Sequence, residues 1–493
     1  MDKYIRIRKQ DTVAVALEEL SKGTAIVVDE EKIILQDNIP KGHKFALEDI
    51  KEGSEVYKYG YSIGRARCDI HRGWWVHTHN MATGLDGILE YKYEKISNTI
   101  EPTESRSFMG YRRSDGRVGV RNEIWIIPTV GCVNNVAQSI AQRAKEYIKG
   151  NIDGIYAFTH PYGCSQLGDD QNNTRRILAA LANHPNAGGV LILGLGCENS
   201  NIDEIRKVMG SFDDKRVRFL AAQEHEDEIE SSLKLIKELI EYAGGLNREA
   251  VCVSELIVGL KCGGSDGLSG ITANPVTGVF SDTLISKGGT TILTEVPEMF
   301  GAETILMNRC ADEKVFHKTV SLINDFKEYF ISHGQQVYEN PSPGNKAGGI
   351  TTLEDKSLGC TQKSGTAQVS GVIGYGESVA VKGLNLLSAP GNDLVAATAL
   401  AAAGAQIVLF TTGRGTPFSC PVPTVKLSTN TELKERKNKW IDFDCGSVVK
   451  GTSIEKLADR LFEYVIDVAS GKYVKAEEAG YHDMAIFKQG VTL

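Results

Sequence analysis

Three short apolar runs in this chain each end in a glycine-containing turn that carries a cysteine. The runs are residues 124–127, 155–158 and 190–193, and the cysteines that follow them are Cys132, Cys164 and Cys197. Runs of this length, separated by helical stretches, are typical of parallel strands in one sheet. The carboxyl ends of such strands share an edge, where ligands bind. We therefore expect the three thiols to converge there as iron or zinc ligands with one position open. The alternative is that they are buried cysteines acting as small hydrophobic residues.

Length and composition limit the class of protein. A chain of 493 residues is too long for one core, and 41% hydrophobic with 24% charged residues is typical of a soluble globular protein. No apolar run reaches membrane-span length, and the first residues lack the apolar region of a signal peptide. We therefore expect a cytoplasmic protein whose ten cysteines are thiols or metal ligands rather than disulfides. The net charge of −8 gives no basic footprint for nucleic acid.

The order of predicted strands and helices along the chain indicates a multidomain α/β protein. Residues 1–95 alternate short strands with glycine turns, including a hairpin around the acidic turn 29–31, which predicts a small all-β module. Residues 96–107 are polar and predict a linker. Residues 108–244 and 245–493 alternate strands with helices, which predicts two α/β domains with mostly parallel sheets.

A glycine-rich stretch, residues 261–270, follows a predicted strand and suits an anion at a helix start. It lacks the Gly-Lys-Ser/Thr ending of a phosphate-binding loop. Cys262 and Asp266 within it are candidate ligands or acid/base groups, and a tight structural turn is the alternative. Glu295 and Glu298 end another strand, where one of them could accept a proton or bind metal; first-turn acids of a helix are the alternative.

Two cations and two histidines are further candidates. Lys346 lies in a Pro/Gly loop, and Arg414 lies between two glycines after a buried strand, so either could pair with a substrate carboxylate. His77 and His79 alternate, so both point to one face of an extended segment and one is a candidate acid/base. Cys360 and Cys420 also follow glycine-rich or strand-end segments and form a second possible thiol set with Cys262.

Motifs along the whole chain resemble the altronate/galactarate dehydratase family. They occur in the family's order at residues 39–46, 58–64, 77–80, 110–122, 160–164, 194–198, 261–270, 343–349 and 411–417. The resemblance implies an N-terminal SAF (β-clip) module and a C-terminal Rossmann-like domain. It also implies an iron-requiring hydro-lyase of hexuronate catabolism that converts altronate to 2-keto-3-deoxygluconate. The cofactor is expected to be Fe²⁺ or an iron–sulfur cluster with one open iron, with Mn²⁺ as an alternative.

Combining these motifs gives an expected active site. The expected catalytic residues are His77, His79, Asp266 and Glu295; the expected substrate-binding residues are Lys346, Arg414 and Ser265; the expected metal ligands are Cys132, Cys164, Cys197 and Cys262. The α-proton is removed, the 3-hydroxyl leaves with metal or acid assistance, and cations stabilise the intermediate. The N-terminal module is expected to dock over the α/β part and bring His77 or His79 to the substrate.

The expected partner is a small sugar acid, with no nucleic acid or membrane, and the expected assembly is a homodimer. Two alternative functions stay open. One is a lyase acting on another α-hydroxy acid such as galactarate or sulfolactate. The other is a non-catalytic scaffold that binds a sugar acid.

Overall fold

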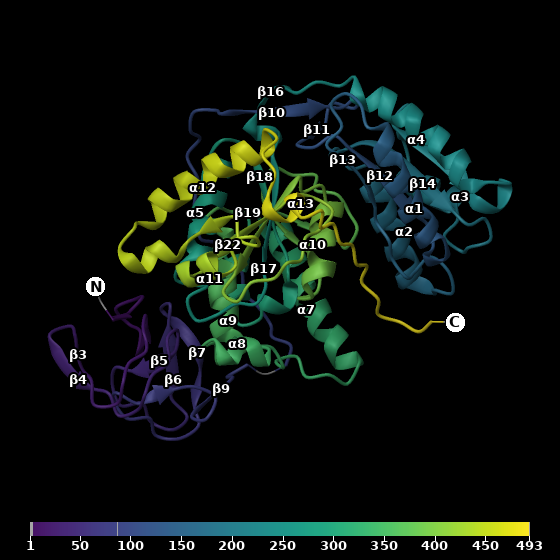
Figure 1. The fold of residues 1–493 in the computed structure, drawn as a ribbon. Helices are drawn as coiled ribbons and strands as arrows, with labels where there is room; N and C mark the ends of the chain where they lie inside the picture. The colour runs from purple at the N-terminus through teal and green to yellow at the C-terminus, as the bar shows by residue number, and fades with distance from the viewer. Residues whose placement is uncertain (1–2, 86, 493) are drawn as a thin grey trace.

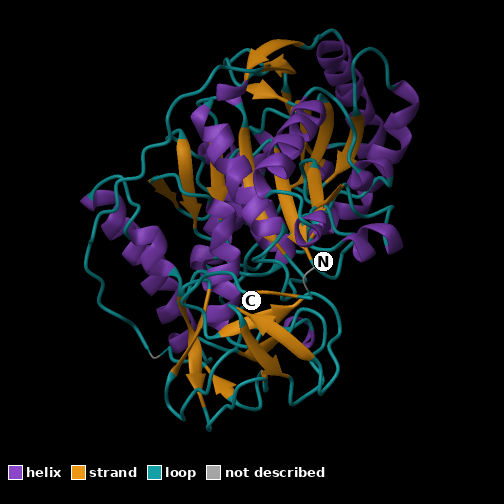
Figure 2. Ribbon diagram, turned by 90° about the vertical axis from the view of Figure 1, so that its left-hand side faces the viewer, coloured by secondary structure: helices purple, strands orange, loops and turns teal. Residues whose placement is uncertain are grey.

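The computed structural model of the protein describes residues 3–85 and 87–492, in a β module and two α/β domains (Figure 1). The strand-rich module lies at one end of the larger α/β domain, and the smaller α/β domain lies on another side of it (Figures 1 and 2). The predicted fold class, a small antiparallel module followed by parallel α/β sheets, is confirmed.

Short antiparallel strands build the module. Its four-stranded sheet has the order β1 (Tyr4–Ile5), β2 (Val13–Ala16), β5 (Lys44–Ala46), β8 (Trp75–Val76), and its three-stranded sheet has the order β6 (Glu55–Lys58), β7 (Tyr61–Ala66), β9 (Met81–Ala82). The predicted hairpin is confirmed as β3 (Ala25–Val28) paired with β4 (Glu31–Ile34). Its turn residues Asp29 and Glu30 have φ of 50° and 70°, a left-handed pair that matches the twist of hairpin strands.

The smaller α/β domain is a four-stranded parallel sheet with helices on both faces. Its order is β13 (Gly154–Ala157), β12 (Glu123–Pro128), β14 (Ala187–Gly194), β15 (Val217–Ala221). Every residue of β14 is buried, as expected for a central parallel strand covered on both faces. One face packs against α1 (Asn134–Ala144) and α4 (Glu228–Gly244), the other against α2 (Gly168–Ala182) and α3 (Ile202–Met209).

A separate small sheet marks where the chain enters and leaves this domain. β10 (Ser107–Arg112) pairs antiparallel with β16 (Glu249–Cys252) and with β11 (Val118–Gly119).

The larger domain is built on a seven-stranded sheet in which every pairing is parallel. The order is β19 (Val369–Ile373), β20 (Gly383–Leu387), β18 (Thr290–Leu293), β17 (Ile257–Cys262), β21 (Ile407–Thr412), β22 (Thr424–Ser428), β23 (Phe443–Asp444). Its helices are α5 (Ala273–Ser286), α6 (Glu303–Met307), α7 (Glu313–Ser332), α8 (Pro343–Ala347), α9 (Leu353–Cys360), α10 (Asp393–Ala402), α11 (Thr431–Arg436), α12 (Ile454–Ala469) and α13 (Lys475–Glu478).

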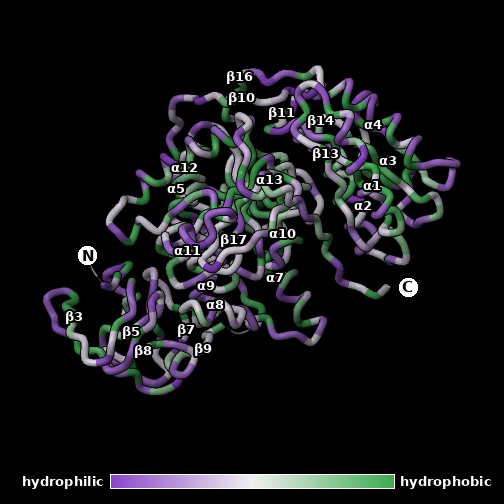
Figure 3. The backbone as a smooth tube through the Cα atoms, in the orientation of Figure 1, coloured by the Kyte–Doolittle hydropathy of each residue, from purple (hydrophilic) through white to green (hydrophobic). Residues whose placement is uncertain are grey.

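The two α/β domains share a hydrophobic core. α5 and α12 pack together on one face of the large sheet, and α10 covers the other face. α10 also packs against α2, so buried side chains of both domains, such as Leu400 and Ile177, form one cluster. The central strands are accordingly mostly green in the hydropathy colouring of Figure 3, with purple concentrated on the outer helices and loops. No helix in the described ranges combines the length and hydropathy needed to cross a bilayer.

The β module docks on the larger domain through buried contacts. Leu268, Ile271 and Leu358 of the larger domain belong to the same apolar cluster as the core of the module. The stretch between β9 and β10, outside residue 86, contains no helix or strand and follows the surface of the larger domain. Tyr91 donates to Glu303 at 2.6 Å, and Lys95 donates to the carbonyl of Ala311 at 2.7 Å.

Candidate functional site

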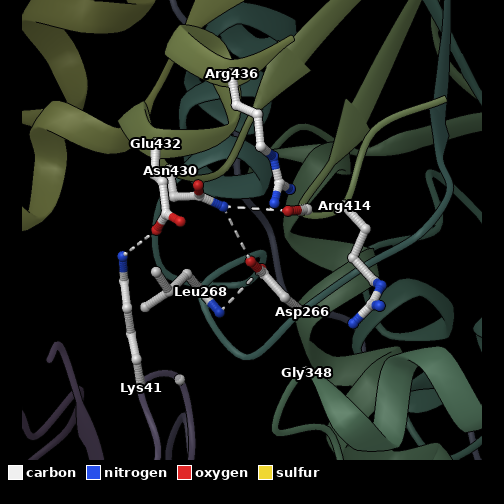
Figure 4. A pocket seen from close by; sticks show the side chains of 10 residues that line it. Lys41, Asp266, Leu268, Gly348, Arg414, Asn430, Glu432 and Arg436 are labelled. Atoms are coloured by element: carbon white, nitrogen blue, oxygen red, sulfur yellow. Dashed lines mark hydrogen bonds and ion pairs between the residues drawn. The ribbon is translucent and has the colours of Figure 1, made fainter. Parts of the chain in front are cut away.

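The carboxyl edge of the seven-stranded sheet and the docked module enclose a cavity of about 300 Å³ (Figure 4). The module contributes Lys41 and Gly42, and the loops of the larger domain contribute Asp266, Leu268, Gly348, Gly413, Arg414, Asn430, Glu432 and Arg436. β17, β21 and β22 end next to these loops, so the cavity lies where ligands bind in open parallel sheets. The glycines bring the two parts close together: a Cβ on Gly267 would lie 1.9 Å from the carbonyl oxygen of Gly42.

Cations without acidic partners surround this cavity. The Arg414 guanidinium makes one long contact, 3.5 Å from Nη1 to the carbonyl of Gly344. Within the described ranges, the side chains of Arg436 and Lys346 have no hydrogen bond or ion pair, and Lys346 lies in α8 two residues before Gly348 of the cavity wall. Lys41 of the cavity wall is the exception, because its Nζ lies 3.5 Å from Glu432 Oε2. Unpaired guanidinium groups at a cavity suit a carboxylate ligand, which they can bind through two parallel hydrogen bonds.

Asp266 is the acidic group of the cavity that the sequence predicts. Its two oxygens accept hydrogen bonds from Thr429 Oγ1 at 2.9 Å, Ser269 Oγ at 3.0 Å and Asn430 Nδ2 at 3.3 Å. Burial raises the pKa of Asp266 above its usual value although these donors oppose the shift. The side chain is therefore fixed in place and more basic than an exposed aspartate.

Two thiols and a carboxylate meet at the ends of β17, α9 and the short 3₁₀ turn Val296–Glu298. The sulfur of Cys262, the last residue of β17, lies 3.3 Å from that of Cys360, the last residue of α9, and each sulfur lies 3.2 Å from Glu298 Oε2. All three residues are buried. Among the described residues, these are the three His, Cys, Asp or Glu side chains whose donor atoms all lie within 4.8 Å of one another.

Three buried lysines surround this group. Lys363 Nζ lies 2.9 Å from the Cys262 sulfur, Lys356 Nζ lies 2.8 Å from Glu298, and Lys261 contacts Glu295 and lies 2.9 Å from Asp393. The hydrogen bond from Cys360 and the charge of Lys363 lower the pKa of the Cys262 thiol to about 6, although burial opposes this shift. Burial raises the pKa of Glu295 well above its usual value.

One lysine connects the thiol group to the cavity loops. Lys356 Nζ also donates to Asn345 Oδ1 at 3.2 Å, and Asn345 Nδ2 donates to the carbonyl of Ser265 at 2.9 Å. Ser265, a predicted substrate-binding residue, is buried in the loop between Cys262 and Asp266. The predicted residues Ser265, Asp266, Lys346 and Arg414 therefore lie on adjoining loops. Glu295 contacts Lys261 and does not line the cavity.

The two predicted histidines follow β8 of the module. His77 is buried, with Nδ1 3.2 Å from Thr351 Oγ1 in the larger domain, whereas His79 is exposed beside Trp75. Burial and the nearby charge of Lys44 lower the pKa of His77 to about 3. Neither histidine lines the cavity, so their assignment as acid/base groups stays a prediction.

A buried ion-pair group lies beside His77. Asp355 of α9 receives Lys44 Nζ at 2.8 Å and Lys58 Nζ at 3.0 Å, and all three side chains are almost inaccessible to solvent. Both lysines come from the module and the aspartate from the larger domain, so this group fastens the module in place.

The cysteines of the smaller domain form a separate arrangement. Cys132, Cys164 and Cys197 follow β12, β13 and β14 and are exposed. Cys262 belongs to the other sheet and contacts Cys360 rather than these three. Cys420 contacts Thr424 at 3.2 Å, so the second thiol set of the sequence analysis is reduced to Cys262 and Cys360.

Several residues of the site escape sequence reasoning. Lys356, Lys363, Arg436 and Asn345 were not singled out, because a lysine or arginine in a helix or loop usually lies on a solvated surface. One sequence feature could have pointed to the two lysines: Lys356 and Lys363 flank Cys360 in the otherwise uncharged stretch 356–363.

Comparison with known proteins accounts for the whole chain. The description "Altronate/galactarate dehydratase SAF domain" matches residues 2–84, "D-galactarate dehydratase/Altronate hydrolase, second domain" matches 110–244, and "D-galactarate/Altronate dehydratase, C-terminal" matches 253–492. The chain is 55% identical to an altronate dehydratase of Bacillus subtilis (strain 168) and 51% identical to one of Escherichia coli (strain K12), each over 100% of both chains. It is 32% identical to a galactarate dehydratase (L-threo-forming) of Escherichia coli (strain K12), over 98% of this chain and 96% of the relative. The predicted family is thereby confirmed: the chain belongs to the altronate/galactarate dehydratase family.

Proposed function

We propose that this protein is a hydro-lyase that converts altronate to 2-keto-3-deoxygluconate and water. The observation that carries this proposal is the identity of 51–55% to two altronate dehydratases over full length, against 32% to a galactarate dehydratase. The cationic cavity is consistent with it, because altronate carries one carboxylate. We further propose a homodimer, for which a mass measurement in solution is the test.

The arginines of the cavity are proposed to hold the substrate carboxylate. Arg414 and Arg436 both line the cavity and lack acidic partners in the described structure, and Lys346 is a third candidate. Loss of the α-proton places negative charge on the carboxylate oxygens, so these cations would stabilise the intermediate more than the substrate.

Asp266 is the proposed base. It lines the same cavity, and burial raises its pKa, which makes it a stronger proton acceptor than an exposed aspartate. Hydrogen bonds from Thr429 and Ser269 keep its oxygens in a fixed orientation. His77 and His79 stay predictions for the acid that assists departure of the 3-hydroxyl.

The Cys262–Glu298–Cys360 group fits a divalent metal ion by its donors. Two sulfurs and a carboxylate oxygen within 3.3 Å of one another are ligands that iron accepts. The pKa of the Cys262 thiol is lowered to about 6, whereas that of the Cys360 thiol is raised well above its usual value, so a cation bound here would displace the Cys360 proton.

Iron held by these residues would supply Lewis-acid assistance to loss of the 3-hydroxyl. The chain's own contribution is positioning. Lys363 and Lys356 hold the Cys262 sulfur and the Glu298 carboxylate in place, and Lys356 joins them through Asn345 to the loop of Ser265. Glu295, which contacts Lys261 and lies 3.7 Å from Lys363, is proposed to fix the positions of both lysines.

The test of function is a substrate panel on anaerobically purified protein supplied with Fe²⁺. Keto-acid formation is measured for altronate, galactarate and sulfolactate at equal concentrations. The proposal expects the highest kcat/KM for altronate. A higher value for either other acid would transfer the proposal to that substrate, and binding of altronate without turnover would favour the non-catalytic scaffold.

The test of the metal assignment compares two buried cysteines. Cys360→Ser should weaken iron retention during dialysis by more than about tenfold, because it removes a ligand. Cys420→Ser is the matched control, since Cys420 is also buried but contacts Thr424. Equal iron retention in the two variants would remove Cys360 from the metal site.

A further inference from the structure

We propose that Glu432 selects against sugar acids that carry a second carboxylate, so that the cavity takes an acid whose far end is a neutral hydroxyl. This inference rests on the proposed function and deepens it by naming the residue that separates aldonates from aldarates. Altronate ends in a neutral hydroxymethyl group, whereas galactarate carries a carboxylate at both ends. The charge that the cavity presents to the far end of the acid therefore discriminates between the two.

The proposed base Asp266 lies between the loop that carries Arg414 and the start of the helix that carries Glu432. A Cβ on Gly413 would lie 2.3 Å from Asp266 Cγ, and Arg414 follows Gly413 directly. Asn430 Nδ2 donates to Asp266 Oδ2 at 3.3 Å, and Glu432 is two residues further along the chain. Arg414 and Glu432 both line the cavity, and Figure 4 shows them on opposite sides of Asp266.

The reaction sets the orientation of the substrate in this arrangement. The proton to be removed is on the carbon next to the reacting carboxylate, so that carbon must face Asp266. When Arg414 holds the carboxylate, the rest of the carbon chain extends past Asp266 toward Glu432. The far end of the acid is thereby brought to the part of the cavity wall that carries Glu432.

Glu432 presents a negative charge there that is only weakly compensated. Its Oε2 lies 3.5 Å from Lys41 Nζ of the β module, and both side chains are exposed. An exposed ion pair of this length contributes little, so Lys41 does not cancel the charge. A terminal hydroxyl can donate a hydrogen bond to the Glu432 carboxylate, whereas a second carboxylate can only accept hydrogen bonds and is repelled.

Removing the charge of Glu432 would affect a second carboxylate in two ways. The repulsion is lost, and Lys41, which lines the same cavity, loses the acidic group beside it and becomes available to the ligand. Both changes favour an aldarate and leave the groups around the reacting carboxylate unaltered. The substitution therefore acts on the choice between acids more than on the reaction itself.

The experiment measures altronate turnover by the full-length protein supplied with Fe²⁺, with galactarate as the competing acid. Glu432→Gln keeps the size of the side chain and removes its charge. It should lower the inhibition constant of galactarate at least about tenfold, while KM for altronate changes less. Adding Lys41→Met to Glu432→Gln should reverse part of this gain. Glu432→Asp, which keeps the charge, should keep the discrimination.

The matched control is Glu435→Gln, the same substitution on the same helix at a residue outside this cavity. It should leave both constants at their wild-type values. An unchanged inhibition constant in Glu432→Gln, or an equal fall in Glu435→Gln, would overturn the inference. The two acids also differ in stereochemistry, but that difference is the same for every variant, so a change between variants reports the charge.

The outcomes separate this inference from the proposed function. Altronate turnover with an unchanged inhibition constant in Glu432→Gln overturns the inference alone. Absence of altronate turnover in the wild type overturns the proposed function. Calorimetric titration with each acid then tests the inference by itself: Glu432→Gln should tighten binding of galactarate relative to altronate, and an unchanged ratio of the two affinities would overturn it.

Discussion

Asp355→Asn should release the β module from the larger domain. The substitution keeps the size of the side chain and removes the charge that pairs with Lys44 at 2.8 Å and Lys58 at 3.0 Å. Lys44 keeps the carbonyl of Gly349 and Thr351 Oγ1 as acceptors, but Lys58 loses its carboxylate. Removing one partner of a buried ion pair costs about 3–5 kcal/mol, because the remaining charge is left without compensation in a medium of low polarity.

Hydrogen–deuterium exchange of the module measures this cost. Peptides that cover β5 and β7 should exchange about two to four powers of ten faster in Asp355→Asn than in the wild type, since 1.36 kcal/mol corresponds to a factor of ten. Peptides from the smaller domain should be unchanged.

A matched control is available on the same module. Asp69 also receives a lysine, Lys51, at 2.8 Å, but both side chains are exposed. Asp69→Asn should leave exchange near the wild-type rate, because solvent screens an exposed pair. Replacing all three buried groups together, as Lys44→Met, Lys58→Met and Asp355→Leu, should recover much of the loss. Equal exchange in Asp355→Asn and Asp69→Asn would refute the reasoning.

Three other predictions concern pH, substrate and metal. Burial lowers the pKa of His160 to about 4 and of His184 to about 3, so each stays neutral in the folded protein while the unfolded chain takes up a proton near pH 6.5. Each histidine should therefore lower the free energy of unfolding by up to about 1.4 kcal/mol per pH unit as the pH falls from 6.5 to 4. A thermal unfolding midpoint that does not change between pH 7 and pH 4.5 would contradict this. Arg414→Met should raise KM for altronate about 10- to 150-fold, the loss expected for a charged hydrogen bond, and Lys346→Met should raise it less because Lys346 does not line the cavity; steady-state kinetics that show equal effects would contradict this order. Chelation of iron should abolish turnover and Fe²⁺ should restore it, whereas full activity in a chelated, aerated sample would exclude the iron mechanism.

Sequence patterns predicted the elements whose hydrophobic periodicity is strong. Apolar residues recur at helical spacing along residues 227–242 and 454–469, and these stretches form α4 and α12. The strand-end loops with Asp266 and Arg414 meet at one cavity because parallel strands share their carboxyl edge.

The remaining features depend on contacts that periodicity does not record. α9 was not expected as a helix because all eight of its residues are buried, so it has no polar face to alternate with an apolar one. That helix supplies Cys360, Lys356 and Asp355. Without predicting it, sequence analysis could not predict which residues form the thiol group and the buried ion pairs. The pairing of Cys262 with Cys360 joins positions 98 residues apart, and no local pattern specifies such a pair.

The fastening of the β module has a consequence for synthesis of the protein on the ribosome. Lys44 cannot form its ion pair until Asp355, which is 311 residues later in the chain, has been synthesised. At roughly 5–20 residues per second, the ribosome needs roughly 15–60 seconds to add those residues. During that interval the module's docking surface, with its two lysines, is exposed to solvent without its counterpart. The first part of the protein to be made is therefore among the last to reach its final position, and a chaperone that shields this surface would act within that interval.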